Sequence, residues 1–222
     1  MNRYSPKEVF AKGKTVITAH SACEGTAPNS REHILAAIAS CSEMIEVDVR
    51  LAGDVLYLSH DVPEDIGSCV TLREMFELVA PEENLEMNLD VKTEGLIDPV
   101  MARAKEFDLC SRITFTGACN DDRALANSYG AEMWRSMWPN AGEEVPEALE
   151  IIKKDGSPYL NVHFSMMTDE YDAALRAAGK GFSAWTVDTE ENLRLFLEKG
   201  ISNITTRKPV MALKLRKEIQ GM

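Results

Sequence analysis

The stretch 44-MIEVDVR-50 decides the kind of fold that this chain can adopt. Its β-branched residues alternate with Glu46 and Asp48, and such alternation predicts a β-strand. Because side chains two positions apart in a strand point the same way, both carboxylates face one side and the apolar residues face the other. We therefore predict a strand that packs against helices on one face and carries polar groups on the other.

Short apolar segments of this kind recur along the chain and alternate with segments of helical periodicity. This rhythm is typical of repeated βα units around a parallel sheet, and eight units can be counted. The predicted strands are residues 15–19, 44–50, 85–91, 113–116, 132–136, 160–162, 181–187 and 201–205. The predicted helices are residues 32–41, 72–80, 99–107, 121–128, 146–154, 169–178, 190–199 and 209–218.

These units predict an α/β fold, a (β/α)₈ TIM barrel in a single domain that spans residues 1–222. Thr71 and Thr168 have the character of helix N-caps, and Gly200 that of a helix stop. Residues 54–58 are expected to pair behind the second strand and to bring His60 to the mouth of the barrel. An open doubly wound sheet is the alternative architecture.

The formal net charge of -12 disfavours binding to nucleic acid or to anionic lipid. No window approaches the roughly 18 apolar residues of a membrane span, and the first residues lack a secretory signal, so we expect a cytoplasmic protein without stable membrane insertion. The composition does not fix the oligomeric state, and the chain could form a homo-oligomer. The five cysteines lack Cys-x-x-Cys spacing, which argues against a structural zinc site.

Functional groups of βα barrels lie at the C-terminal ends of the strands, and several carboxylates of this chain fall there. Glu46 and Asp48 share one face of the second predicted strand, and Asp90 follows on the next. Buried like charges need compensation, and a hard divalent cation with oxygen ligands supplies it. We predict that these three residues bind one hard divalent cation; a helix cap or an ion pair with Lys92 is the alternative.

Two histidines end neighbouring elements and are candidates for proton transfer. His20 and His60 are predicted to flank a phosphorus atom as general acid and base. Lys92 is the nearest positive charge for a phosphate oxygen. Trp185 is predicted to pack against the alcohol portion of a substrate; a core tryptophan is the alternative. His33 is expected at the surface of a helix.

In their order and spacing these motifs resemble those of the glycerophosphodiester phosphodiesterase family over nearly the whole chain. The residues that carry the resemblance are Ala19-His20, Pro28-Asn29-Ser30, Ile45-Glu46-Val47-Asp48-Val49, Leu58-Ser59-His60-Asp61, Asn88-Leu89-Asp90-Val91-Lys92 and Ala184-Trp185-Thr186-Val187-Asp188. The resemblance implies a metal-dependent phosphodiesterase that releases an alcohol and glycerol 3-phosphate. It also implies a small-molecule phosphodiester substrate and one Mg²⁺ or Ca²⁺ held by Glu46, Asp48 and Asp90. His20 and His60 would then be the general acid and base, and Lys92 would bind phosphate.

Three positions depart from the family pattern. Ser21 stands where the family has an arginine, the glutamate of a Pro-Glu-Asn-Thr motif is missing at Pro28-Asn29-Ser30, and the third metal ligand is Asp90 where glutamate is usual. Asp90 also resembles the sphingomyelinase D barrels, so a related phosphodiesterase or lyase is one alternative. A phosphate-binding barrel with weakened turnover and a barrel lyase or isomerase are the others. The short segment after His60 predicts an open mouth.

Overall fold

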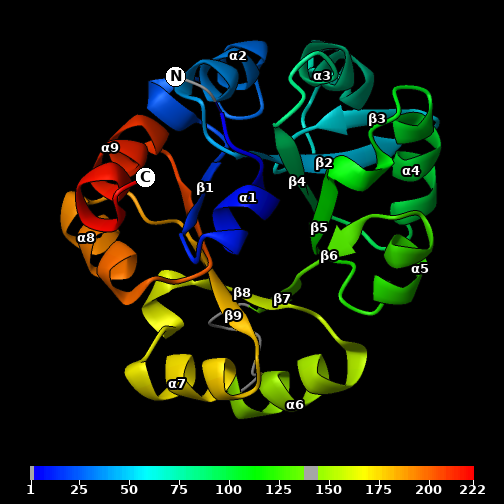
Figure 1. Cartoon of the computed structure of the whole chain (residues 1–222). Helices are drawn as coiled ribbons and strands as arrows, with labels where there is room; N and C mark the ends of the chain where they lie inside the picture. The colour runs from blue at the N-terminus through cyan, green and yellow to red at the C-terminus, as the bar shows by residue number, and fades with distance from the viewer. Residues whose placement is uncertain (1–2, 138–144) are drawn as a thin grey trace.

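The computed structural model describes residues 3–137 and 145–222, and its parallel strands form a nearly closed barrel ringed by helices (Figure 1). The strands are β1 (Val16–Ala19), β2 (Met44–Ala52), β3 (Val55–Leu58), β4 (Glu86–Val91), β5 (Ile113–Gly117), β6 (Glu132–Met133), β7 (Arg135–Met137), β8 (Tyr159–His163), β9 (Gly181–Trp185) and β10 (Asn203–Thr206). Their spatial order is β6-β5-β4-β2-β1-β10-β9-β8-β7, with β3 antiparallel to β2. The predicted barrel is confirmed.

Helices follow the strands in the order that the sequence predicts. The α-helices are α1 (Pro6–Ala11), α2 (Arg31–Ser40), α3 (Leu72–Val79), α4 (Ile97–Lys105), α5 (Arg123–Ser128), α6 (Val145–Asp155), α7 (Asp169–Ala177), α8 (Glu190–Lys199) and α9 (Pro209–Gln220). Short 3₁₀ helices are η1 (Cys23–Gly25), η2 (Ile66–Ser68), η3 (Cys110–Arg112) and η4 (Phe164–Met166). Thr71 and Thr168 cap α3 and α7, and Gly200 ends α8 in the left-handed conformation, as predicted.

One predicted strand, residues 132–136, is divided at Trp134. Its ladder to β5 ends at Met133, and its ladder to β8 begins at Arg135. Strands of a barrel are staggered, so the neighbours on the two sides pair with different segments of the same strand. The chain continues from β6 into β7 and thereby connects the two ends of the sheet.

The sequence analysis did not predict α1, which lies across the centre of the ring in Figure 1. A capping box between Ser5 and Glu8 starts this helix. Its Val9 packs with Val16 and Met44, the first residues of β1 and β2. The helix therefore closes the N-terminal end of the barrel and leaves the opposite end as the mouth.

The strand faces that point into the barrel carry small polar side chains joined by hydrogen bonds, where many barrels carry bulky branched residues. We call this set the polar belt, and it consists of Thr18, Asn88, Thr116, Ser136, Asn161, Ser183 and Asn203. Thr18 donates to Asn203, Asn203 to Ser183, and Ser183 to Asn161, at 2.7 to 3.0 Å. The belt forms the floor beneath the mouth.

A buried ion pair connects the last helix to the start of the barrel. Arg216 of α9 donates to both carboxylate oxygens of Glu43, at 2.8 and 2.9 Å, and to the Thr15 carbonyl oxygen. Glu43 also accepts from the Ile17 backbone N–H. Removing one partner of such a pair leaves a buried charge without compensation.

We expect Arg216→Met to lower the free energy of unfolding by roughly 3–5 kcal/mol, because Glu43 would remain buried and unpaired. Urea denaturation measures the change. Arg194→Met is the matched control, since Arg194 pairs with Glu190 and Glu218 in an exposed position, where an ion pair contributes far less to stability than a buried one. Equal effects of the two substitutions would contradict the role assigned to the buried pair.

Candidate functional site

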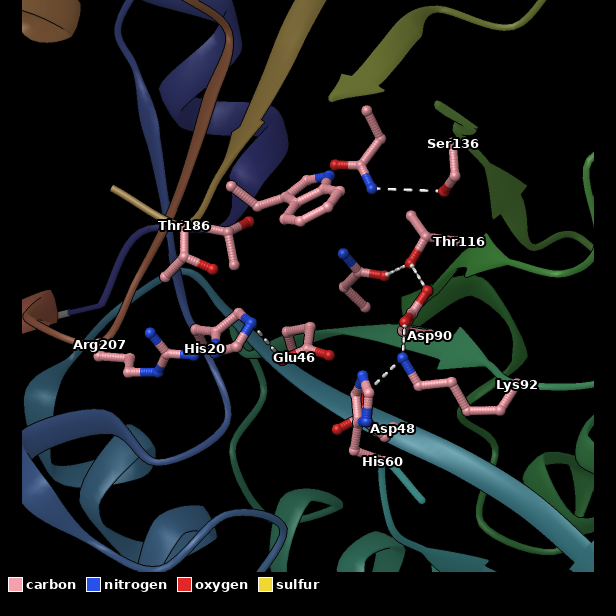
Figure 2. A pocket seen from close by; sticks show the side chains of 14 residues that line it. His20, Glu46, Asp48, His60, Asp90, Lys92, Thr116, Ser136, Thr186 and Arg207 are labelled. Carbon is pink, nitrogen blue, oxygen red and sulfur yellow. Dashed lines mark hydrogen bonds and ion pairs between the residues drawn. The ribbon is translucent and has the colours of Figure 1, made fainter. Parts of the chain in front are cut away.

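The three predicted metal ligands converge at the mouth of the barrel (Figure 2). Asp48 on β2 is in register with Asp90 on β4. Two residues earlier on each strand, Glu46 is in register with Asn88. One carboxylate oxygen from each acid lies within 4.8 Å of the others. The pairing of β2 with β4 thus brings together side chains that are about 40 residues apart in the sequence.

Each carboxylate is held by a specific neighbour. Glu46 Oε2 accepts from the Ser21 backbone N–H at 2.9 Å, and Asp90 Oδ1 lies 3.0 Å from the Thr116 hydroxyl. Asp48 Oδ2 accepts from the Asn29 side-chain amide at 2.7 Å. The other carboxylate oxygens of Asp48 and Asp90 contact the Lys92 ammonium.

Asn29 holds Asp48 at both ends. Its Nδ2 donates to the carboxylate, and its Oδ1 accepts from the Asp48 backbone N–H at 3.0 Å. Asn29 has φ of 54°, in the left-handed region that asparagine tolerates better than most residues. The sequence analysis assigned Asn29 no role of its own, and its place before the N-cap Ser30 gave no sign of one.

Lys92 lies between two of the acids. Its Nζ is 2.6 Å from Asp48 Oδ1 and also forms a close ion pair with Asp90 Oδ2. Burial opposes a charged ammonium, but Asp90 and Asp48 outweigh it and raise the pKa of Lys92. The lysine is therefore a permanent cation within the carboxylate cluster, and the ion pair considered as an alternative in the sequence analysis is present.

The acids differ in their electrostatic environment. Burial, reinforced by the charges of Asp48 and Asp90, raises the pKa of Glu46 well above its ordinary value. Burial also acts to raise the pKa of Asp48, but the Lys92 charge and the Asn29 hydrogen bond overcome it and the net shift is downward. A cation bound among these oxygens would stabilise the ionised form of Glu46.

The carboxylates provide the hard oxygen ligands that Mg²⁺ and Ca²⁺ prefer. Glu46 and Asp48 are buried, Asp90 is partly buried, and the oxygens are close enough to share one ion. The residues of this site therefore fit a divalent cation.

His20 follows β1 and lies beside Glu46, with its Nε2 at 3.8 Å from Glu46 Oε2. Its Nδ1 is 2.9 Å from the Ser21 carbonyl oxygen, which can only accept a hydrogen bond. Nδ1 is therefore the protonated nitrogen of the neutral ring, and the lone pair is on Nε2. Burial lowers the pKa of His20, which favours this neutral form.

His60 lies in the segment after β3, on the open side of the carboxylates. β3 pairs with β2 as predicted, and Arg50 of β2 donates two hydrogen bonds to the His60 carbonyl oxygen. The ring Nδ1 is 3.1 Å from Asp61 Oδ1. The side chain is 68% exposed, in agreement with the predicted open mouth.

All seven residues predicted for the site, which include Trp185, line one cavity of about 300 Å³. The floor of the cavity is formed by members of the polar belt such as Asn161 and Ser136. Trp185 Nε1 is buried and makes no hydrogen bond with any residue that the structure describes. The cavity also contains Arg207, which the sequence analysis did not select.

The other two histidines of the chain, His163 and His33, do not line the cavity. His163 makes an edge-to-face contact with Trp185, with ring centroids 5.3 Å apart. His33 is fully buried in α2, so its predicted surface location is wrong. Neither ring nitrogen of His33 has a hydrogen-bond partner among the described residues, and burial lowers its pKa to about 4.

Fold and site together define a βα barrel with an acidic, histidine-flanked cavity at its C-terminal end. Comparison with solved structures finds barrels of the same kind. A candidate glycerophosphoryl diester phosphodiesterase from Agrobacterium tumefaciens is 19% identical, with a TM-score of 0.83 over 94% of this chain and 100% of that chain. The glycerophosphodiester phosphodiesterase from Thermotoga maritima is 20% identical, with a TM-score of 0.76 over 91% and 98%.

A phosphodiesterase from Oleispira antarctica, solved with the product sn-glycerol-3-phosphate, is 19% identical, with a TM-score of 0.69 over 95% of this chain and 98% of that chain. No family model and no curated protein matches the sequence. The similarity confirms the predicted resemblance at the level of the fold. None of the described helices has the length and apolar character of a membrane span.

We expect Asn29→Gly to weaken Mg²⁺ or Ca²⁺ binding by about 10–100-fold, since glycine keeps the positive φ but removes both contacts to Asp48. Isothermal titration calorimetry measures the affinity. Ser30→Gly is the control, because Ser30 caps α2 and does not contact the carboxylates. Unchanged cation affinity in Asn29→Gly would contradict the positioning role.

We expect His33→Leu to gain stability over the unsubstituted protein as the pH falls from 7 to 5. A histidine whose folded pKa is about 4 contributes stability above its unfolded pKa of about 6.5 and loses it at lower pH. The difference in unfolding free energy should grow by about 2 kcal/mol. Urea denaturation at both pH values measures it, and a difference independent of pH would contradict the buried, neutral state of His33.

Proposed function

We propose that this protein is a metal-dependent phosphodiesterase that hydrolyses glycerophosphodiesters, or related head-group diesters, to an alcohol and glycerol 3-phosphate. The observation that carries the proposal is the convergence of three carboxylates and two histidines in one cavity. The similarity in fold to glycerophosphodiester phosphodiesterases, and to a phosphodiesterase solved with the product sn-glycerol-3-phosphate, supports it.

Glu46, Asp48 and Asp90 would hold one Mg²⁺ or Ca²⁺. When bound, such an ion supplies positive charge that polarises a phosphoryl oxygen and offsets the charge that develops during displacement at phosphorus. The cavity is small and polar, so it suits a hydrophilic head group. Trp185 lines the cavity and offers an apolar ring face, which suits the carbon skeleton of an alcohol portion.

The two histidines have environments suited to opposite roles. The tautomer of His20 leaves its Nε2 lone pair available, so His20 serves as the base that accepts the proton of the attacking hydroxyl. His60, oriented by Asp61 at the exposed side of the cavity, serves as the acid that protonates the departing alcohol oxygen. An acid at the open side places the leaving alcohol where it can diffuse away. Lys92 binds a phosphate oxygen.

The proposal predicts that glycerophosphocholine incubated with the protein and Mg²⁺ or Ca²⁺ releases glycerol 3-phosphate. His20→Ala and His60→Ala should each lower kcat by about 10²–10⁴-fold, because each removes one proton-transfer group. Release can be followed with a coupled assay of glycerol 3-phosphate. Removal of divalent ions by EDTA should abolish turnover, and adding the cation back should restore it.

His163→Ala is the matched control, since His163 contacts Trp185 edge-to-face but does not line the cavity. If the unsubstituted protein releases no product from a panel of diesters with either cation, the phosphodiesterase proposal fails. A protein that then still bound glycerol 3-phosphate would be a binding barrel, the alternative raised by the sequence.

A further inference from the structure

Charge is unevenly distributed around the cavity. Among the described residues that line it, three carboxylates are balanced by two permanent cations, Lys92 and Arg207. The Lys92 ammonium contacts both Asp48 and Asp90, so its charge is largely offset by these carboxylates. A phosphate group that enters the His20 side of the cavity therefore requires a second source of positive charge.

Arg207 stands on that side because of the way the barrel closes. β1 and β10 are parallel neighbours, with Ala19 in register with Thr206. The His20 backbone N–H donates to the Thr206 carbonyl oxygen at 2.9 Å. The residue after Thr206 is thereby placed next to His20, and Figure 2 shows the Arg207 side chain extending toward the His20 ring.

Two neighbouring segments fix the position of Arg207. Its backbone N–H donates to Asp188 Oδ1 at 2.7 Å, and its Nη1 donates to Asp188 Oδ2 at 2.9 Å. Its carbonyl oxygen accepts from the Glu24 backbone N–H at 2.9 Å. Asp188 follows β9, so the arginine is held from the adjacent strand end as well as from its own.

The guanidinium keeps donors available. Nε and Nη2 of Arg207 make no hydrogen bond with any residue in the described part of the chain, and these two groups share one edge of the planar fork. An arginine edge with two parallel N–H groups matches the spacing of two phosphate oxygens. No cation is available from β1 itself, since Ser21 follows His20 and its backbone N–H is used by Glu46.

We propose that Arg207 is a phosphate-binding residue of this cavity, that it binds two phosphate oxygens through Nε and Nη2, and that Asp188 is its positioning residue. The proposal rests on the proposed function for the nature of the ligand. It assigns opposite sides of the phosphate to different cations: one side to Lys92 and the divalent ion that the three acids would hold, and the other to Arg207 beside His20. The loop after β10 thereby becomes part of the substrate site.

The test measures binding of sn-glycerol 3-phosphate by isothermal titration calorimetry, with saturating Mg²⁺ or Ca²⁺, so that it does not depend on turnover. Arg207→Gln should weaken binding by about 10–100-fold, since two charge-assisted hydrogen bonds are lost. Arg207→Lys should recover only part of the affinity, because an ammonium cannot bind two oxygens in parallel. Asp188→Asn should weaken binding less, and should add nothing further in the Arg207→Gln background.

Cation affinity is the second readout, and it should be unchanged in Arg207→Gln, because Arg207 contacts none of the three acids. Lys208→Gln is the matched control, since Lys208 is adjacent in sequence but does not line the cavity. Loss of glycerol 3-phosphate binding in Arg207→Gln alone would support the inference even if the unsubstituted protein had no diesterase activity. Equal binding by the unsubstituted protein and Arg207→Gln, or no binding by either, would overturn it.

Discussion

The site depends on one electrostatic constraint: three carboxylates, two of them buried, lie within a few ångströms of one another at the mouth of the barrel. Carboxylates so placed repel one another and lose hydration, so each needs a compensating group. The Ser21 backbone N–H compensates Glu46, Asn29 compensates Asp48, and Thr116 contacts Asp90. The loops around the site therefore adopt conformations that bring hydrogen-bond donors to the acids, and the left-handed backbone at Asn29 is one example.

The same constraint explains the positions of the two positively charged side chains in the cavity. Lys92 directly follows β4, the strand that carries Asp90, and lies between two acids. The negative charges of these acids raise the pKa of Lys92. Arg207 follows β10, the neighbour of β1, and forms an ion pair with Asp188. The cavity thus combines strong local charges with a small net charge, an arrangement that suits a charged ligand without destabilising the barrel.

Much of this architecture could be predicted from the sequence, because period-2 alternation and parallel order are local and regular. Glu46 and Asp48 fall on one strand face for that reason, and the next unit brings Asp90 beside them. Helix α1 has only six residues, too few for a periodic pattern, and the division at Trp134 depends on the stagger of the whole barrel. His33 was placed wrongly because a helix that packs on several sides has no clear polar face.

The roles of Asn29 and Arg207 could not be predicted in this way, since each depends on which loops meet at the mouth.

The polar belt beneath them has a different consequence. Asn203 donates a hydrogen bond to Ser183, and Ser183 donates one to Asn161. Replacing one of them therefore leaves a donor or acceptor on a neighbouring β-strand without its partner. Substitutions around the ring should therefore be energetically coupled, and the lumen can be remodelled only by concerted changes on adjacent strands.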